Sequence, residues 1–179
     1  MKPFKLLALS GSLRRNSCNA AAIRALQMLA PDHIHIDIGS IGNLPLFNPD
    51  RETEVIPEVD KLKSAVKRAD GLIIASPEYA HGISGPMKNA LDWLIGGTEF
   101  PYKPIMLINT SPRSRHAQDA LKEVLFTMSG IVVEESSVSI PLLSSGLDAK
   151  GIVKNKNMAD ALLKGLSEFC RAIEEIKSG

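Results

Sequence analysis

Apolar residues along this chain alternate between short continuous runs and longer stretches with helical spacing. The short runs predict buried strands, and the alternating segment HIHIDI predicts one more. The five expected strands cover residues 4–9, 33–38, 71–75, 105–108 and 131–133. Helical spacing predicts helices over 17–29, from Pro57 onward, and over 87–95, 118–128 and 157–176.

The order of these elements is five units of a strand followed by a helix. That order predicts an α/β fold in which helices cover both faces of a parallel sheet. No break in composition divides the 179 residues, so we expect a single domain over 1–179. In such sheets, ligands bind beyond the carboxyl ends of the strands, where the strand order reverses. The loops after the first, third and fourth strands are therefore the expected site.

Composition narrows the classes of function. Apolar residues make up 44% of the chain, charged residues 23%, and the formal net charge is +1. This balance of charges does not indicate a surface that binds a nucleic acid or a membrane. No apolar run is long enough to span a bilayer. Cys18 and Cys170 show neither disulfide nor metal spacing. We expect both thiols to be reduced, the protein to be cytoplasmic, and no metal to be bound.

The loop after the first strand carries the residue types of an anion site. Gly11 permits a tight turn, and the loop leads directly into a helix, whose N-terminus attracts anions. A P-loop and the three-glycine dinucleotide fingerprint are both incomplete here, which leaves a hydroxyl-rich cradle for the phosphate of a mononucleotide. In the alternative, Ser17 only caps the helix and the arginines are solvated. The polar side chains concerned are Ser10, Ser12, Arg14, Arg15, Ser17 and Asn19.

The loop after the third strand runs from Ser76 towards Trp93. Pro77 stiffens its start, glycines let the backbone approach a ligand closely, and Tyr79 offers a flat face. The segment is expected to border a planar ring. For Trp93 we favour packing as its role. Three polar residues of the following helix are expected to form a buried polar set or a subunit contact: Lys88, Asn89 and Asp92.

Three motifs, taken together, resemble the NADPH-dependent FMN reductase family: Ser-Leu-Arg-x-x-Ser-x-Asn ending at Asn19, Ser-Pro-Glu-Tyr ending at Tyr79, and Gly-x-x-Lys-Asn-Ala-x-Asp-Trp ending at Trp93. The resemblance implies a flavodoxin-like three-layer αβα sandwich whose five-stranded parallel sheet has the order 2-1-3-4-5. It also implies FMN as cofactor and no catalytic side chain. The implied cofactor-binding residues are Ser12, Arg14, Ser17, Cys18 and Asn19 near the phosphate, and Pro77, Glu78, Tyr79, Ala80 and Ser111 near the ring.

The same resemblance implies an activity. NADPH or NADH would reduce the FMN, which would pass electrons to a small acceptor: a flavin, a quinone, an azo compound or chromate. It also implies a homodimer or homotetramer. One alternative is a flavodoxin-like electron carrier without its own nicotinamide reductase activity, but carriers tend to be acidic and this chain has a pI near 7.8. A second alternative is a regulatory or structural protein that has lost its flavin. The intact phosphate loop argues against this alternative.

Two segments depart from the family pattern. Many relatives have Asn where this chain has Ala80, followed by His81. After Ser111 they often have a glycine-rich stretch, where this chain has 112–116 with Arg113 and Arg115. We hypothesise that one of these arginines binds the 2′-phosphate of NADPH, and that His81 borders the flavin face. The alternative in each case is a solvated side chain.

Overall fold

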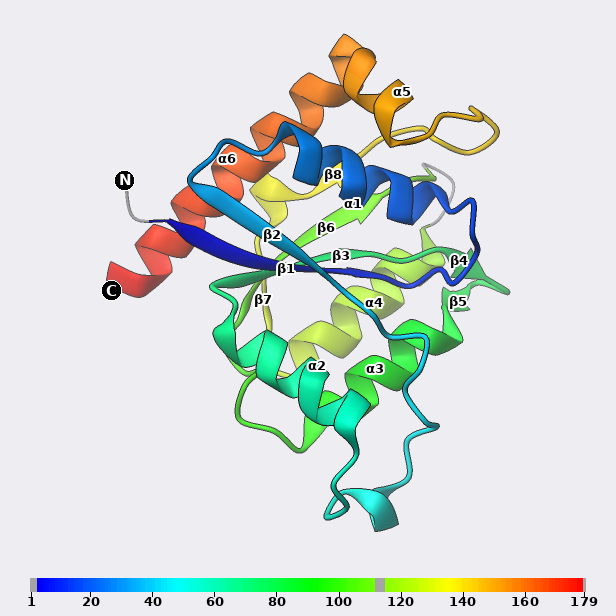
Figure 1. Cartoon of the computed structure of the whole chain (residues 1–179), viewed down its shortest axis with the longest axis vertical. Coiled ribbons are helices and arrows are strands. Elements are labelled where there is room, and N and C mark those ends of the chain that lie inside the picture. The colour runs from blue at the N-terminus through cyan, green and yellow to red at the C-terminus, as the bar shows by residue number, and fades with distance from the viewer. Residues whose placement is uncertain (1–2, 112–114, 179) are drawn as a thin grey trace.

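A twisted parallel sheet forms the centre of the molecule (Figure 1). The computed structural model describes residues 3–111 and 115–178. The sheet has the order β2-β1-β3-β6-β7, and β8 also pairs with β6. This confirms the predicted order, because β7 and β8 stand where one fifth strand was expected. The strands are β1 Phe4–Ser10, β2 Ile34–Gly39, β3 Gly71–Ala75, β6 Pro104–Asn109, β7 Ile131–Val132 and β8 Val138–Ser139.

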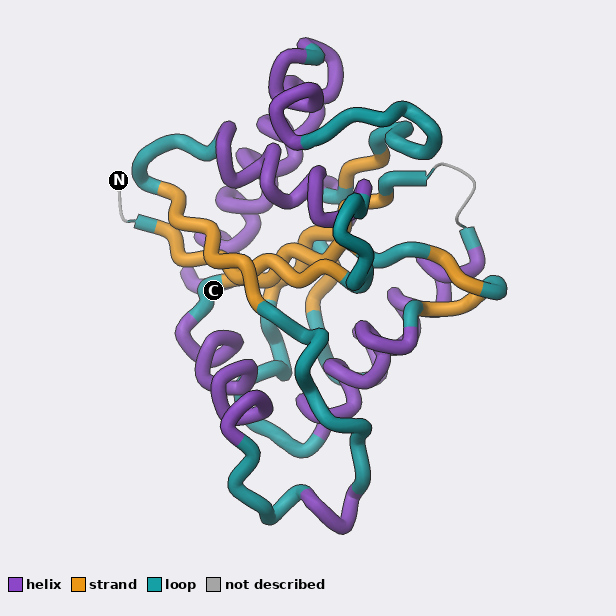
Figure 2. Tube along the Cα trace, turned by 45° about the vertical axis from the view of Figure 1, so that its right-hand side comes forward, coloured by secondary structure: helices purple, strands orange, loops and turns teal. Residues whose placement is uncertain are grey.

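Helices cover both faces of the sheet, as the alternation of elements predicted (Figures 1 and 2). One face carries α1, α5 and α6, and the other carries α2, α3 and α4. Both termini lie near the end of the sheet that is opposite to β4 and β5 (Figure 1). The helices are α1 Cys18–Leu29, α2 Pro57–Arg68, α3 Gly85–Ile95, α4 His116–Thr127, α5 Ala149–Lys154 and α6 Lys156–Ser178.

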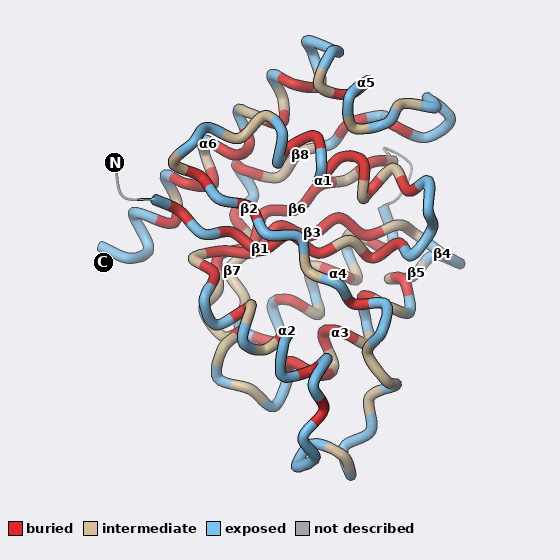
Figure 3. Tube along the Cα trace, in the orientation of Figure 1, coloured by how far each residue is buried: buried red, intermediate tan, exposed pale blue. Residues whose placement is uncertain are grey.

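Successive residues of the central strands fill two separate cores. In β1, Leu6 and Ala8 pack in the core on the side of α1 and α6, while Leu7 and Leu9 pack on the other side. All five residues of β3 are buried. The central strands are accordingly the most continuously buried part of the chain (Figure 3). A strand that is covered on both faces must be apolar throughout, which is why it appears in the sequence as an unbroken run.

The fifth strand is interrupted, which the sequence did not predict. β7 pairs with the start of β6 and β8 with its end, and the 3-10 turn η2 Glu134–Ser136 separates them. Helix α6 packs directly on this turn. A Cβ atom at Gly165 would lie 2.7 Å from the carbonyl oxygen of Ser136. The helix can approach the turn this closely only because it carries a glycine there.

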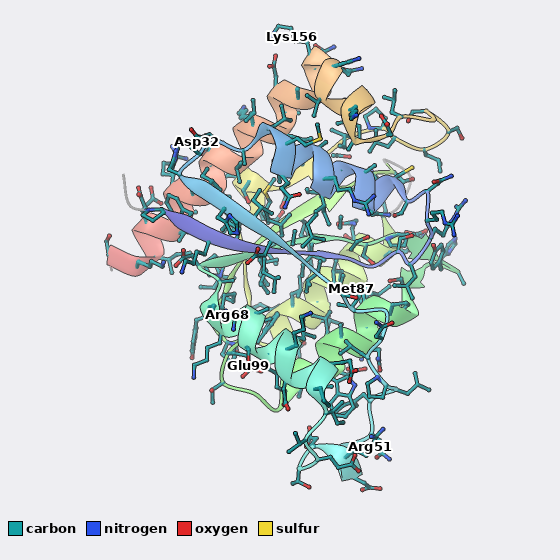
Figure 4. All side chains as sticks on the ribbon, in the orientation of Figure 1. Asp32, Arg51, Arg68, Met87, Glu99 and Lys156 are labelled. Carbon is teal, nitrogen blue, oxygen red and sulfur yellow. The ribbon has the colours of Figure 1, made fainter. Side chains whose placement is uncertain are left out.

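The segment between β2 and α2 projects from the body of the molecule (Figures 1 and 2). It includes the 3-10 turn η1 Pro49–Arg51 at its tip, where Arg51 is labelled in Figure 4. Two side chains of α3 hold its base. Trp93 Nε1 donates to the Pro45 carbonyl oxygen at 2.8 Å, and Asn89 Nδ2 donates to the same oxygen at 2.9 Å. Trp93 is therefore a packing residue, as expected.

Lys88 and Asp92 of α3 do not belong to a buried polar set, which was one of the two expectations for them. Lys88 and Asp92 form an ion pair across one turn of the helix, at 2.5 Å. The Lys88 side chain is exposed, so this pair contributes little to stability.

A two-residue hairpin follows β3 and was not predicted. Strands β4 Glu78–Tyr79 and β5 Gly82–Ile83 are antiparallel, and Tyr79 pairs with Gly82. The turn residues Ala80 and His81 have φ values of 49° and 60°. Positive φ at both positions defines a type I′ turn, which favours Asn and Gly. A non-glycine residue in this left-handed region is strained by roughly 1 kcal/mol or more.

We expect Ala80→Gly to raise the free energy of unfolding of the apoprotein by about 0.5–1 kcal/mol, because it removes the steric cost of positive φ. Urea unfolding, followed by circular dichroism, measures this change. The control is Ala172→Gly in the middle of α6, where the same substitution should lower stability by about 1 kcal/mol. Equal destabilisation by both substitutions would show that the turn is unstrained.

Candidate functional site

A cavity of about 290 Å³ opens at the carboxyl ends of β1, β3 and β6. It lies where the strand order reverses between β1 and β3, which is the position that the topology rule predicts. All three loops that were expected to form a site contribute to it. The residues that line it are Ser12, Arg14, Asn16, Ser17, Cys18, Asn19, Ser76, Pro77, Glu78, Tyr79, Asn109, Thr110, Ser111 and Leu143.

Gly11 brings the first two loops into direct contact. Its N–H donates to the Ala75 carbonyl oxygen at 2.8 Å, and its own carbonyl accepts from Ser84 Oγ at 2.7 Å. A Cβ atom at Gly11 would lie 2.5 Å from Ser76 Oγ and 2.7 Å from Ser84 Oγ. No side chain fits in this space, so only glycine lets the β1 loop lie against the β3 loop.

Polar side chains surround the N-terminus of α1, where the first N–H groups of the helix have no intrahelical partner. Ser17 caps the helix, since its Oγ accepts from Ala20 N–H at 3.2 Å. Ser17 is therefore a helix cap that also lines the cavity. Asn19 Oδ1 accepts from Thr110 Oγ1 at 3.1 Å. Because this bond engages the amide oxygen, the Asn19 NH₂ group remains available to a ligand.

Glu78 uses its side chain to join two loops of the site. Its Oε2 accepts from Ala117 N–H, in the first turn of α4, at 2.9 Å. A carboxylate at a helix N-terminus compensates unpaired N–H groups and the helix dipole. With the side chain engaged in this way, the part of Glu78 that is free to face a ligand is its backbone. Tyr79 beside it is half exposed and offers an open flat surface.

The third wall comes from the segment after β6. Asn109 Oδ1 accepts from Ser111 N–H at 2.9 Å, which turns the chain sharply at the edge of the cavity. Five lining residues were not predicted. Three of them end a strand or directly follow one, so they could have been predicted from the rule that ligands bind at the carboxyl ends of the strands. Asn16 lies within the predicted phosphate loop. Leu143 has no sequence feature that would have indicated a site. These residues are Asn16, Ser76, Asn109, Thr110 and Leu143.

Five predicted residues lie outside the lining of this cavity. Two of them belong to the loop before α1: Ser10 Oγ accepts from Ser12 N–H at 3.3 Å, and Arg15 is exposed. Ala80 is in the hairpin turn. His81 is exposed and stacks on His116, with ring centroids 4.5 Å apart and an angle of 15° between the rings. Arg115 is exposed and precedes α4. Arg113 lies outside the described residues.

Within residues 3–111 and 115–178, no cluster of three or more histidine, cysteine or acidic side chains has the spacing to hold a metal ion. No helix in the same ranges combines the length and the apolar character that crossing a membrane requires.

The donor set fits one kind of cofactor. Hydroxyls, an amide, an arginine and a helix N-terminus suit a phosphate monoester, and the backbone of Pro77–Tyr79 leaves space for a planar ring beside it. A flavodoxin-like sheet with such a cavity is typical of FMN-binding proteins.

Comparison with known proteins gives the family. The model of the NADPH-dependent FMN reductase family matches residues 4–143. A 2-hydroxy-1,4-benzoquinone reductase from Burkholderia sp. is 34% identical, with 96% of this chain and 97% of the relative covered. An NAD(P)H-dependent FMN reductase from Pseudomonas aeruginosa is 31% identical, with 83% of each chain covered.

A solved structure is similar over almost the whole chain. It is the flavoenzyme NAD(P)H:(acceptor) oxidoreductase FerB from Paracoccus denitrificans, with a TM-score of 0.85, 27% identity, and coverage of 96% of this chain and 98% of that one. The chain therefore belongs to the NADPH-dependent FMN reductase family, and it is an FMN-dependent NAD(P)H oxidoreductase.

We expect Gly11→Ala to weaken FMN binding by about tenfold or more, because relieving the contact with two serine hydroxyls must separate the two loops. Titration of apoprotein with FMN, followed by the quenching of flavin fluorescence, measures the dissociation constant. The control is Gly85→Ala at the start of α3, where an added Cβ meets no atom within 4 Å. Equal affinity in the two variants would show that the contact at Gly11 does not shape the site.

Proposed function

We propose that the cavity binds one FMN, with its phosphate at the N-terminus of α1 and its ring along the β3 loop. Three observations support this: the donors around α1, the close contact at Gly11, and the family to which the chain belongs. In this proposal the whole chain acts as one domain. The phosphate contacts are Ser12, Arg14, Ser17, Cys18 and Asn19, and the ring contacts are Pro77, Glu78, Tyr79 and Ser111, with Ala80 supporting the turn beside them.

The residues of the chain bind and orient, while FMN, when bound, supplies the chemistry of hydride and electron transfer. Because Glu78 is held by α4, the backbone of Glu78 and Tyr79 is presented in one orientation. A backbone N–H that is fixed in this way can donate to the ring without rearrangement, and such preorganised donors stabilise developing negative charge. No side chain is required as a general acid or base.

We propose NADPH or NADH as the electron donor and a quinone or a free flavin as the acceptor. The support is the names of relatives that share 34% and 31% of their residues with this chain over most of its length. The cavity volume of about 290 Å³ is at the lower end for ligand sites. A bound flavin would accordingly keep part of its ring open, which lets a donor and an acceptor reach the same face in turn.

Self-association as a homodimer or homotetramer is the second part of this proposal. Leu46 and Val55, on the projecting segment, are 83% and 86% exposed, and Ile95 on the neighbouring α3 is also exposed. Apolar side chains gathered at one end of a molecule favour contact with another protein surface. We propose that the surface is used by a second copy of this chain, and that the protein acts in the cytoplasm, where its two free cysteines stay reduced.

The test is to record the visible spectrum of the purified protein and titrate it anaerobically with NADPH and with NADH. We expect stoichiometric FMN, bleaching of the flavin by a nicotinamide, and reoxidation on addition of a benzoquinone. An electron carrier would bind FMN but would not be bleached without a partner enzyme. A colourless protein that does not take up FMN would contradict the proposal as a whole.

We expect FMN to protect Cys18 from alkylation, because this thiol lines the cavity at the first residue of α1. Mass spectrometry after iodoacetamide treatment at about pH 8 measures the rate, which saturating FMN should lower about tenfold or more. Cys170 is the internal control: burial raises the pKa of its thiol to about 12, so it should stay unmodified with or without FMN. Equal rates at Cys18 in both conditions would place FMN elsewhere.

A further inference from the structure

A second cavity, of about 450 Å³, lies on the other side of the α1 N-terminus. It is enclosed by the first two turns of α1 and by the segment that joins β8 to α5. Its volume is in the range of small-molecule sites. Nothing in the proposed binding of FMN uses it.

The two cavities meet at the point where the FMN phosphate is proposed to bind. Asn16, Ser17 and Cys18 line both of them. A ligand whose phosphate sits at the N-terminus of α1 can therefore extend from the first cavity into the second without leaving the surface of the protein. FMN ends at that phosphate, so anything beyond it belongs to a longer ligand.

Two arginines give the second cavity a positive character. Arg15 lines it from the loop before α1, and Arg24 lines it from α1, seven residues after Ser17 and thus on the same face of the helix. Among the described residues, neither guanidinium takes part in an ion pair or donates a hydrogen bond to another side chain. An unpaired guanidinium suits a phosphate group.

The remaining lining complements these charges. Asp148 is the acidic side chain of the cavity, but its Oδ1 already accepts from Gly151 N–H at 2.8 Å as the cap of α5. Leu147 gives a partly exposed apolar side chain, while Leu142 and Ala21 in the same lining are buried. Apolar walls with two free guanidinium groups suit a purine nucleotide, whose base packs on apolar surface and whose phosphate pairs with arginine.

We propose that this cavity is a subsite for the adenosine phosphate part of a dinucleotide, and that Arg15 and Arg24 bind its phosphate. The proposal rests on the proposed function, since it takes the FMN phosphate position as its starting point. The adenosine phosphate has two possible sources. It belongs to FAD, which would span both cavities, or to NADPH, which would reach the subsite from the open face of the flavin.

The experiment compares wild-type protein with Arg24→Ala, Arg15→Ala and the charge-retaining Arg24→Lys. Arg24 is the main probe, because it is outside the proposed FMN contacts. Arg68→Ala is the matched control, an exposed arginine in the last turn of α2 on the other side of the sheet (Figure 4). For each variant, apoprotein is titrated with FMN and with FAD by fluorescence, and KM is measured for NADPH and NADH at saturating FMN.

If FAD is the source, Arg24→Ala lowers the affinity for FAD about tenfold and leaves that for FMN within about twofold, and Arg24→Lys recovers part of the loss. Arg15→Ala also lowers the affinity for FAD about tenfold. If NADPH is the source, the same variants raise KM for NADPH about tenfold while KM for NADH stays constant. The Arg68→Ala control changes none of these values.

Two failures can be told apart. If wild-type protein binds neither flavin, the proposed FMN site is wrong. If it binds FMN, but Arg24→Ala and Arg15→Ala change neither the FAD-to-FMN affinity ratio nor the NADPH-to-NADH KM ratio relative to Arg68→Ala, the FMN site stands and the subsite is overturned.

Discussion

The site depends on the close contact of Gly11 with Ser76 and Ser84. It joins the loop after β1 to the loop after β3, because Ser84 Oγ donates to the Gly11 carbonyl at 2.7 Å and leaves no room for a side chain. One loop carries the donors that we propose to bind a phosphate, and the other carries the backbone that we propose to face the ring. The spacing between them therefore depends on a buried hydrogen bond at the strand ends, which form a rigid part of the fold.

A second bond extends this arrangement to the third loop. Glu78 links the β3 loop to α4 through Ala117 N–H, and α4 is the helix that follows the β6 loop. The Glu78 carboxylate thus serves as a cap of α4, where it compensates the unpaired N–H groups and the dipole of the helix.

Prediction from sequence succeeded where a physical rule has a local signature. The buried strand at 71–75 was predicted correctly because a strand covered on both faces must be apolar, and the loop before α1 was correctly expected to border the site. Its role in holding a phosphate stays a prediction. The hairpin at Ala80 and His81 was not predicted, because the usual sequence signal of a type I′ turn is Asn-Gly. Here Ala80 and His81 adopt positive φ, which neither residue type favours. Thr110 was missed because its role lies in a bond to Asn19, 91 residues away in sequence, and such a pairing exists only in the folded chain.

The interrupted fifth strand leads into a segment that borders both cavities. Gly165 lets α6 press on the turn η2, and the chain then returns to β6 as β8 and continues along its end. Ile140 N–H donates to the Asn109 carbonyl at 2.9 Å, and Leu142 N–H donates to that of Thr110 at 3.0 Å. These bonds carry the following residues across the N-terminus of α1, where Leu143 borders the first cavity and Leu142 and Leu147 border the second. The segment after β8 therefore forms part of the wall of both cavities.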